Sequence, residues 1–343
     1  MDKVSRSKLV FGVRMAEKEA RMDLPILGID IAKRKFDVAL MVGGKIKNKV
    51  CQNTPEGFKE LLRWLERQGV RQTHACMEAT GNYGEALAVA LGDAGHLVSI
   101  VNPARIQGFA KSELLRTKTD QVDAGLIARF CAAMKPDAWT PPPVEVRHLQ
   151  ALVRRLDVLN ALKMEEENRL ESTPADSPTV SSIQAHLHFL RKEIAATEAL
   201  IRDHFDQYSG LRAQRDLLTS IPGIGDKTAA VILAEIRCVG DYESARQLVA
   251  YAGLAPRERL SGSSVRGKAR LCKTGNGRLR RALYMPAVVA KRYNPTIQAF
   301  CHRLLERGKA PKAVIGAAMR KLLHIVYGVL KSGRPFDPGL AIN

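Results

Sequence analysis

The sequence predicts a mixed α/β domain followed by a mainly helical half, and three observations point to this class. Short apolar runs alternate with stretches of helical spacing up to about residue 134. The proline-rich stretch KPDAWTPPPVEV, residues 135–146, then predicts a boundary. Beyond that boundary, apolar residues follow helical spacing almost to the C-terminus. A chain of 343 residues is long enough for two or three domains.

The α/β part begins with three predicted strands. ILGIDIAKRKFDVALMV, residues 26–42, has the pattern of a strand, a short polar break and a second strand, and the glycines that follow predict a turn into KIKNKVCQN. Residues 55–69 have helical spacing between Pro55 at the first turn and Gly69 at the end. The alternation continues with strand THACMEAT, helix NYGEALAVALGDAG, strand HLVSIVNP and helical spacing to about Met134. This order predicts a mixed sheet.

The helical half begins with two long amphipathic segments. Leucines from Leu149 to Leu159 are spaced by three or four residues, and after the polar stretch 172–182 the same spacing runs from Ile183 to Ile201. Nearly three heptads of this kind fit two helices that pack within one chain as well as a coiled coil that joins two chains. Further on, SIPGIGDKTAAVIL predicts a helix-hairpin-helix, and helices are expected to about residue 330.

Domain boundaries follow from these changes of pattern. We expect a basic leader, a mixed-sheet domain, a helical linker with coiled-coil spacing and a mainly helical C-terminal domain, at residues 1–23, 24–145, 146–210 and 211–343. The leader lacks the apolar stretch of a signal peptide, and no apolar run reaches about 18–20 residues, the length of a membrane span. Six scattered cysteines without a CxxC pair argue against a zinc site or a disulfide framework. We therefore expect a cytoplasmic protein with no membrane partner.

Positive charge is concentrated at the C-terminal end. The net charge is +19, and residues 256–343 hold 19 Lys and Arg against 3 Asp and Glu, so +16 of the total lies there. Such a surface favours a polyanionic partner, most often nucleic acid. The N-terminal two-thirds is close to balanced, which leaves that part for a chemistry that needs acids.

Four acidic residues in the α/β part are candidate metal ligands. Asp30 interrupts the apolar strand LGIDIAK, and Glu78 ends the apolar strand CMEATG. Asp120 and Asp123 in KTDQVDAGLIARF lie three residues apart, on one face of a helix. Carboxylates that converge on one or two Mg²⁺ ions support phosphoryl chemistry. Viewed singly, the two helical aspartates have a simpler reading as an N-cap and a first-turn acid, and we interpret Asp37 as a surface or turn acid.

The second candidate region is RLSGSSVRGKARLCKTGNGRLRRALYMPA, where serines lie among basic residues and glycines. A serine hydroxyl attacks a phosphodiester when its proton is removed and the phosphate charge is neutralised. No Ser-His-Asp triad is visible there, so a loop that only grips phosphate is the simpler reading. The PGIG turn predicts a hairpin backbone that approaches a phosphate, or else a plain turn between core helices. The candidate nucleic-acid contacts are Gly223, Gly225, Lys227, Arg257, Arg259, Arg266, Lys268, Arg270, Lys273, Arg278, Arg280 and Arg281.

These motifs resemble the DEDD-type transposases of bacterial insertion sequences, the family that includes the Piv and MooV DNA invertases. GIDIAK, MEATG and KTDQVDA carry the resemblance in order over residues 26–134. It implies a ribonuclease-H-like, RuvC-like fold in which the four candidate acids bind one or two Mg²⁺ ions. IPGIG, AGLAPR, SGSSVRGK and RRALYMPA extend the resemblance over about residues 26–340. There it implies a catalytic serine, aligned at Ser261, with Ser263 as the alternative.

The same resemblance implies a mechanism and partners. The serine would form a transient phosphoserine link to DNA, and acids and serine would meet across subunits in a dimer of dimers that holds donor and target duplexes. A non-coding guide RNA encoded by the element would select both by base pairing, although composition does not separate RNA from DNA binding. The protein would then act at the bacterial nucleoid. Two alternatives are a metal nuclease or Holliday junction resolvase that uses water, and a non-catalytic nucleic-acid-binding scaffold.

Overall fold

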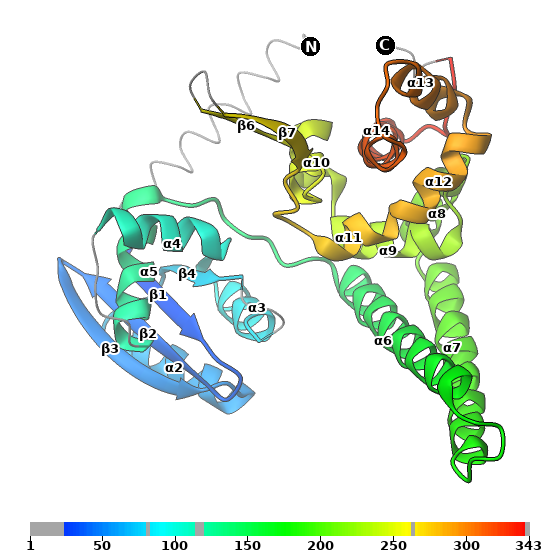
Figure 1. Ribbon diagram of the computed structural model, residues 1–343. Coiled ribbons are helices and arrows are strands. Elements are labelled where there is room, and N and C mark those ends of the chain that lie inside the picture. The colour runs from blue at the N-terminus through cyan, green and yellow to red at the C-terminus, as the bar shows by residue number, and fades with distance from the viewer. Residues whose placement is uncertain (1–23, 80–82, 114–119, 262–264, 340–343) are drawn as a thin grey trace. The chain divides into compact units, whose positions relative to one another are not determined.

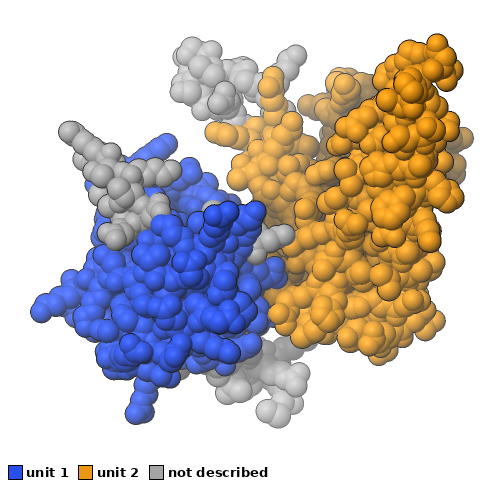
Figure 2. Space-filling view, turned by 90° about the horizontal axis from the view of Figure 1, so that it is seen from below, with its two compact units in different colours: residues 1–141 blue, residues 142–343 orange. Residues whose placement is uncertain are grey.

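In the computed structural model, the chain folds into two compact units, residues 1–141 and 142–343 (Figure 2). The structure describes residues 24–79, 83–113, 120–261 and 265–339. The predicted leader lies outside these residues. Each unit has a buried apolar core of its own, so each is described by itself.

Unit 1 is a five-stranded mixed sheet with helices on both faces (Figure 1). The strand order is β3-β2-β1-β4-β5, in which β1 pairs antiparallel with β2 and parallel with β4. The predicted mixed sheet and its order of helices and strands are confirmed. The elements are β1 (Ile26–Ile31), β2 (Lys35–Val42), β3 (Lys45–Gln52), α2 (Pro55–Arg67), β4 (His74–Glu78), α3 (Glu85–Asp93), β5 (Leu97–Val101), α4 (Pro103–Ser112) and α5 (Asp120–Met134).

The central strands are apolar on both faces because helices cover the sheet from both sides. On one face, Leu27 and Ile29 of β1 pack in a core with Leu61 and Leu65 of α2. On the other face, Cys76 of β4 packs with α5. Strands buried on two faces lose the alternation of polar and apolar residues that marks a half-exposed strand. This explains why these segments appear as nearly continuous apolar runs in the sequence.

Unit 2 is mainly helical, as predicted, and is built around one large apolar core. Its two longest helices, α6 and α7, pack against each other within the chain, and Leu187, Leu190 and Ile201 of α7 are buried. The heptad spacing therefore has a partner in the same chain. The elements are α6 (Val144–Ser172), α7 (Val180–Gln207), α8 (Ser209–Thr219), α9 (Asp226–Ile236), η2 (Val239–Asp241), α10 (Ala245–Tyr251), β6 (Pro256–Ser261), β7 (Val265–Leu271), α11 (Gly277–Ala282), α12 (Tyr284–Tyr293), α13 (Pro295–Glu306) and α14 (Pro311–Ser332).

The hairpin β6–β7 differs from the prediction of an irregular glycine- and serine-rich loop. Its two strands pair antiparallel from Pro256 opposite Leu271 to Ser261 opposite Val265, with a register shift between Arg257 and Arg259. Charged and small residues dominate both strands, so the usual β-forming pattern of branched and aromatic residues is absent from the sequence. Backbone pairing between the two segments, rather than side-chain propensity, defines this element.

Helix α14 is apolar and long enough, by length and composition, to cross a membrane. Half of its apolar window is nevertheless buried inside unit 2. Val314, Leu322 and Val326 belong to the central core of the unit. Core packing thus accounts for the apolar character of this helix.

Candidate active site

Asp30 and Glu78 lie at the carboxyl ends of neighbouring strands. β1 and β4 pair in parallel with Gly28 opposite Cys76, and the two acids lie two residues further along each strand. Because side chains alternate between the faces of a sheet, Asp30 shares the face of Gly28 and Glu78 shares the face of Cys76. Both acidic residues are half-buried. One edge of the sheet therefore presents two carboxylates on the same face.

Helix α5 lies on this face and begins at the same edge. A Cβ added to Gly28 would clash with the carbonyl oxygen of Ala124, so the backbones of helix and strand touch there. Further along α5, Cys131 Sγ lies 4.0 Å from the carbonyl oxygen of His74, at the amino end of β4. The helix thus runs antiparallel to β1 and β4, and its first turn lies toward their carboxyl ends (Figure 1).

Asp120 and Asp123 lie in that first turn. Asp123 is half-buried, whereas the side chain of Asp120, the first residue of α5, lies outside the described residues. The two aspartates precede Ala124 by about 6 Å and about 1.5 Å along the helix axis. Asp30 lies about 6–7 Å beyond Gly28 along β1 in the same direction. The backbone therefore brings all four predicted ligands to one edge of the sheet.

Asp37 is a fifth acid at this edge, and its interpretation as a surface or turn acid is wrong. It lies inside β2, directly opposite Asp30, and only 5% of the residue is exposed. Its Oδ2 atom lies 3.2 Å from Lys35 Nζ. The physical reason is that α5 covers this face of β2, where Ala39 packs against the helix. Local sequence does not reveal that cover.

The donor atoms at this edge suit a hard divalent cation. Mg²⁺ prefers carboxylate oxygens and keeps positions for water and phosphate. Among the described side chains, no group of three His, Cys, Asp or Glu is arranged to hold an ion, and Asp120 is not one of those side chains. The oxygen donors are thus of the type that Mg²⁺ prefers, but the described side chains alone do not assemble a three-ligand group.

Ser261 is the last residue of β6 and pairs with Val265 of β7. Residues 262–264, which include Ser263, lie outside the described residues, as do the side chains of residues 258–269. The side chains of Arg259, Arg266 and Lys268 belong to this group. The structure thus places the Ser261 backbone in the last described pair of a two-stranded hairpin.

Positive charge gathers where this hairpin joins the rest of unit 2. Arg257 and Arg270 lie opposite each other in the register, and both are exposed. The pKa of the nearby Cys272 thiol is lowered, first by hydrogen bonding with Thr274 and then by the charges of Arg257 and Arg280. Both Coulombic contributions stabilise an anion. The base of the hairpin is therefore a region of positive potential.

The other predicted nucleic-acid contacts have different environments. Lys273 and Arg281 are exposed, and Arg278 is half-buried. Arg280 donates from Nη1 to the carbonyl oxygen of Ala252 at 3.0 Å, so part of its guanidinium holds the fold. Lys227 is also exposed, but its charge is paired, because its Nζ lies 2.7 Å from Glu198 Oε1.

The PGIG turn joins α8 to α9, which gives the predicted order of helix, hairpin and helix. Gly223 has a φ of +106°, and a Cβ there would lie 2.9 Å from the carbonyl oxygen of Pro286 in α12. Gly225 is exposed at the start of α9, and a Cβ there would meet open space. Packing against α12 is thus sufficient to require glycine at 223, whereas Gly225 leaves backbone accessible at a helix N-terminus.

A buried polar cluster fixes the chain where it leaves the hairpin, and sequence patterns did not predict it. Glu235 is 5% exposed, and its Oε2 accepts a 2.6 Å hydrogen bond from Asn276 Nδ2. Asn276 Nδ2 also donates to the Tyr251 hydroxyl at 3.1 Å. Asn276 Oδ1 accepts from the N–H groups of Arg278 and Leu279, both at 3.0 Å, and so caps α11. The segment TGNGR carries the signal of a helix cap at Asn276. Nothing local shows that Asn276 also bonds to the buried Glu235, which lies 41 residues away in the sequence.

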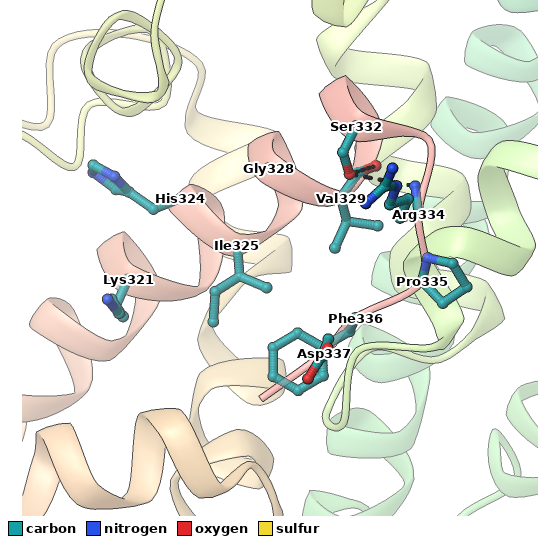
Figure 3. Close-up of a pocket in the computed structure, with 10 residues that line it drawn as sticks. All are labelled: Lys321, His324, Ile325, Gly328, Val329, Ser332, Arg334, Pro335, Phe336 and Asp337. Carbon is teal, nitrogen blue, oxygen red and sulfur yellow. Dashed lines mark hydrogen bonds between the residues drawn. The ribbon is translucent and has the colours of Figure 1, made fainter. Parts of the chain in front are cut away.

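A pocket of about 580 Å³ lies along α14 (Figure 3). Lys321, His324 and Arg334 line it together with Ser332, Asp337 and apolar residues. Burial, followed by nearby positive charges, lowers the pKa of His324. The segment after α14 is held by the Phe336 N–H, which donates to Ser220 Oγ at 2.8 Å. The pocket belongs to unit 2 and shares no residue with the carboxylate edge.

Comparisons with known proteins cover both units. A family model described as "Transposase IS116/IS110/IS902 family" matches residues 215–302, and a DEDD model described as "Transposase" matches residues 27–173. A pilin gene-inverting protein of Moraxella bovis is 36% identical over 320 residues, 92% of this chain and 98% of that protein. A second one, from Moraxella lacunata, has the same identity and coverage. A transposase for insertion sequence element IS1328 of Yersinia enterocolitica is 25% identical over 92% of this chain and 99% of its own length.

The DEDD model covers the sheet with the carboxylate edge, and the second transposase model covers the β6–β7 hairpin, so the two matches define the class as a DEDD transposase. The relatives named above extend over nearly the whole chain and agree with that class. This chain belongs to the IS116/IS110/IS902 transposase family. Its activity is therefore that of an insertion-sequence transposase or recombinase, which acts on DNA.

Proposed function

We propose that this transposase cleaves and rejoins DNA strands with Mg²⁺ held by Asp30, Glu78, Asp120 and Asp123 and with Ser261 as the nucleophile. The observation that carries the proposal is the meeting of two strand ends and the first turn of α5 at one sheet edge. The order of strands and helices in unit 1 also supports a ribonuclease-H-like fold for the catalytic domain.

The four acids would act by holding the metal and fixing its position. When bound, Mg²⁺ neutralises phosphate charge and lowers the pKa of a bound hydroxyl. The parallel register of β1 and β4 holds Asp30 and Glu78 side by side. Asp123 is held by the close contact between α5 and β1. The neighbouring Asp37, paired with Lys35, adds a buried carboxylate that supports this edge without being proposed as a ligand.

Ser261 would attack the phosphorus atom of a DNA phosphodiester. A bond forms between serine Oγ and phosphorus, the bond from phosphorus to the leaving deoxyribose oxygen breaks, and the serine proton ends on that oxygen. Attack by a hydroxyl of another strand reverses these changes and releases the serine. The exposed cations Arg257 and Arg270, at the other end of the hairpin, support this role because they attract the phosphate backbone.

The proposed partners are donor and target DNA duplexes, an element-encoded guide RNA and further copies of the chain in a dimer of dimers at the bacterial nucleoid. The charge of +16 over residues 256–343 supports the nucleic-acid partners. Exposed apolar side chains on the α6–α7 pair support a contact between chains, because such side chains gain from burial. They include Val158, Leu162, Met164 and Leu200.

The decisive experiment separates serine chemistry from water chemistry. The full chain, purified with its bound RNA, is incubated with Mg²⁺ and DNA carrying the ends of its element, and protein–DNA adducts are sought on denaturing gels. We expect an adduct with the unchanged chain and with Ser263→Ala, and none with Ser261→Ala. Cleavage that survives Ser261→Ala would favour the water-using nuclease or junction resolvase.

The metal ligands are tested in the same assay. We expect Asp120→Asn to lower the cleavage rate by about a hundredfold or more, because a ligand of the metal is lost. Asp176 is an exposed acid between α6 and α7. The Asp176→Asn variant is the control and should cleave normally. Cleavage by neither chain would favour the non-catalytic scaffold, and equal cleavage by both would show that Asp120 is not a metal ligand for cleavage. Sequencing the co-purified RNA tests guidance, because a discrete element-encoded RNA is expected rather than random cellular RNA.

A further inference from the structure

One face of α12 is apolar and exposed. Met285 and Tyr293 are 61% and 63% exposed, and Tyr284, Val288 and Val289 are also exposed. These five residues, which we call the α12 stripe, recur at helical spacing over the ten residues of the helix. Isolated exposed apolar residues are ordinary, but a contiguous group of this size marks an interaction surface.

The opposite face of α12 fixes the stripe in its outward orientation. Pro286, Ala287 and Ala290 are buried in the core of unit 2. Gly223 packs so closely on this face that a Cβ would lie 2.9 Å from Ala290 Cβ. Rotation of the helix to hide the stripe would break that packing, so within this unit the stripe stays exposed.

The charged residues next to the stripe in the sequence are positive. Residues 259–305 contain no Asp or Glu. Arg281 lies just before α12, and Lys291 and Arg292 lie within it. The Arg292 guanidinium carbon lies 5.5 Å from the centroid of the Tyr293 ring. Self-association of two such faces would place cations against cations, whereas a polyanion would neutralise them. Charge complementarity therefore favours nucleic acid over a second copy of this chain.

The apolar and aromatic content of the stripe specifies the form of that nucleic acid. A duplex presents phosphates and sugars and keeps its bases stacked inside, so it offers little to Met285, Val288 or Val289. Unpaired bases instead stack on aromatic side chains while cations hold the adjacent phosphates. Tyr284 and Tyr293 are nine residues apart, about 13–14 Å along the helix axis and on opposite margins of the stripe, so each ring offers a separate stacking site.

We propose that the α12 stripe binds unpaired nucleotides of a DNA strand, with bases on Tyr284 and Tyr293 and phosphates on Arg281 and Arg292. We choose DNA over RNA for two reasons. α12 lies within residues 215–302, which match the transposase family, and the proposed strand exchange would leave DNA nucleotides unpaired. The role of this binding rests on the proposed cleavage and rejoining. It would hold a strand that has left its duplex until it is joined again.

The test measures binding of fluorescent single-stranded DNA to the full chain by anisotropy, with EDTA present so that cleavage plays no part. We expect Tyr284→Ala and Tyr293→Ala each to weaken single-strand binding about tenfold and to leave duplex binding unchanged. Tyr293→Phe keeps the ring and should bind normally. Phe189→Ala, which removes an exposed aromatic ring from α7, is the matched control and should also bind normally.

Each other outcome overturns the proposal. Normal single-strand binding by both alanine variants, or an equal loss of duplex binding, would show that stacking on the stripe is not involved. A loss confined to single-stranded RNA would assign the surface to RNA. A change of sedimentation in Val289→Asp, with DNA binding unchanged, would assign it to a second copy. Ser261→Ala should bind single strands normally, so a failure of the serine mechanism is distinguishable from a failure of this inference.

Discussion

Gly28 lies in the middle of β1, where the backbone of α5 comes closest to the sheet. The atoms that a Cβ would meet are the carbonyl oxygen of Ala124 and the amide nitrogen of Ala128, which belong to the backbone and cannot rotate away. The absent side chain therefore sets the distance between helix and strand. Because Asp123 precedes Ala124, the same contact also sets how far this acid lies from Asp30.

We predict that Gly28→Ala destabilises the protein by about 3 kcal/mol or more, at or above the upper end of the usual range for overpacking. The helix must move outward, so Mg²⁺-dependent cleavage should fall as well. Chemical denaturation followed by circular dichroism measures the stability. Gly92→Ala is the control, because a Cβ at Gly92 in α3 would meet no atom within 4 Å. A loss at Gly28 no larger than at Gly92 would contradict the close contact.

At the scale of elements, helix ends determine where functional segments begin. Thr54 accepts a 3.2 Å hydrogen bond from the Gly57 N–H at the start of α2, and Asn102 accepts one of 2.9 Å from the Ala104 N–H at the start of α4. Asn276 caps α11 in the same way but is also tied to buried Glu235. The hydrogen bond to Glu235 links the segment between β7 and α11 to the core of unit 2.

We predict that Asn276→Ala costs about 2–4 kcal/mol of stability, the loss of a cap plus that of the partner of a buried carboxylate. Asn102→Ala removes an exposed cap alone and should cost about 1 kcal/mol. Urea denaturation of both variants measures the difference between them. Equal losses would mean that Glu235 finds another partner, and the proposed fixing of the hairpin would then fail.

At the scale of the whole molecule, the four candidate metal ligands and most of the excess positive charge lie in different units. The carboxylate edge lies in unit 1, and residues 256–343 of unit 2 carry +16 of the net charge. Each unit has its own apolar core, as independent domains do. The proposed metal ligands and the basic C-terminal segment can therefore be tested one at a time.

We predict that residues 24–141 fold alone and unfold cooperatively, and that Mg²⁺ raises their melting temperature by several degrees at about ten times its Kd. Asp123→Asn should lose most of this rise, because a ligand is removed. Residues 142–343 serve as the control, since they lack the four acids and should melt at the same temperature with or without Mg²⁺. An equal rise in both fragments would indicate a general salt effect.

Much of unit 1 was predictable because its signals are local. The order of strands and helices followed from apolar spacing and from residues that mark helix starts, such as Pro55. Asp30 was recognisable as an acid inside an apolar strand. Asp37 was not, because its burial depends on a helix that begins more than eighty residues later. The β6–β7 hairpin was also missed, since its charged strands lack the residues that usually mark strands.

The sequence by itself determined the element order of unit 1, the separation of the four candidate acids from the excess positive charge, and the family. Only the tertiary structure decided which acids share one sheet edge, which glycine allows α5 to approach, and which face of α12 stays exposed. The physical reason is that periodicity and propensity act between neighbours in the chain. Burial and proximity instead depend on which distant element covers a given face, and that is settled only when the chain has folded.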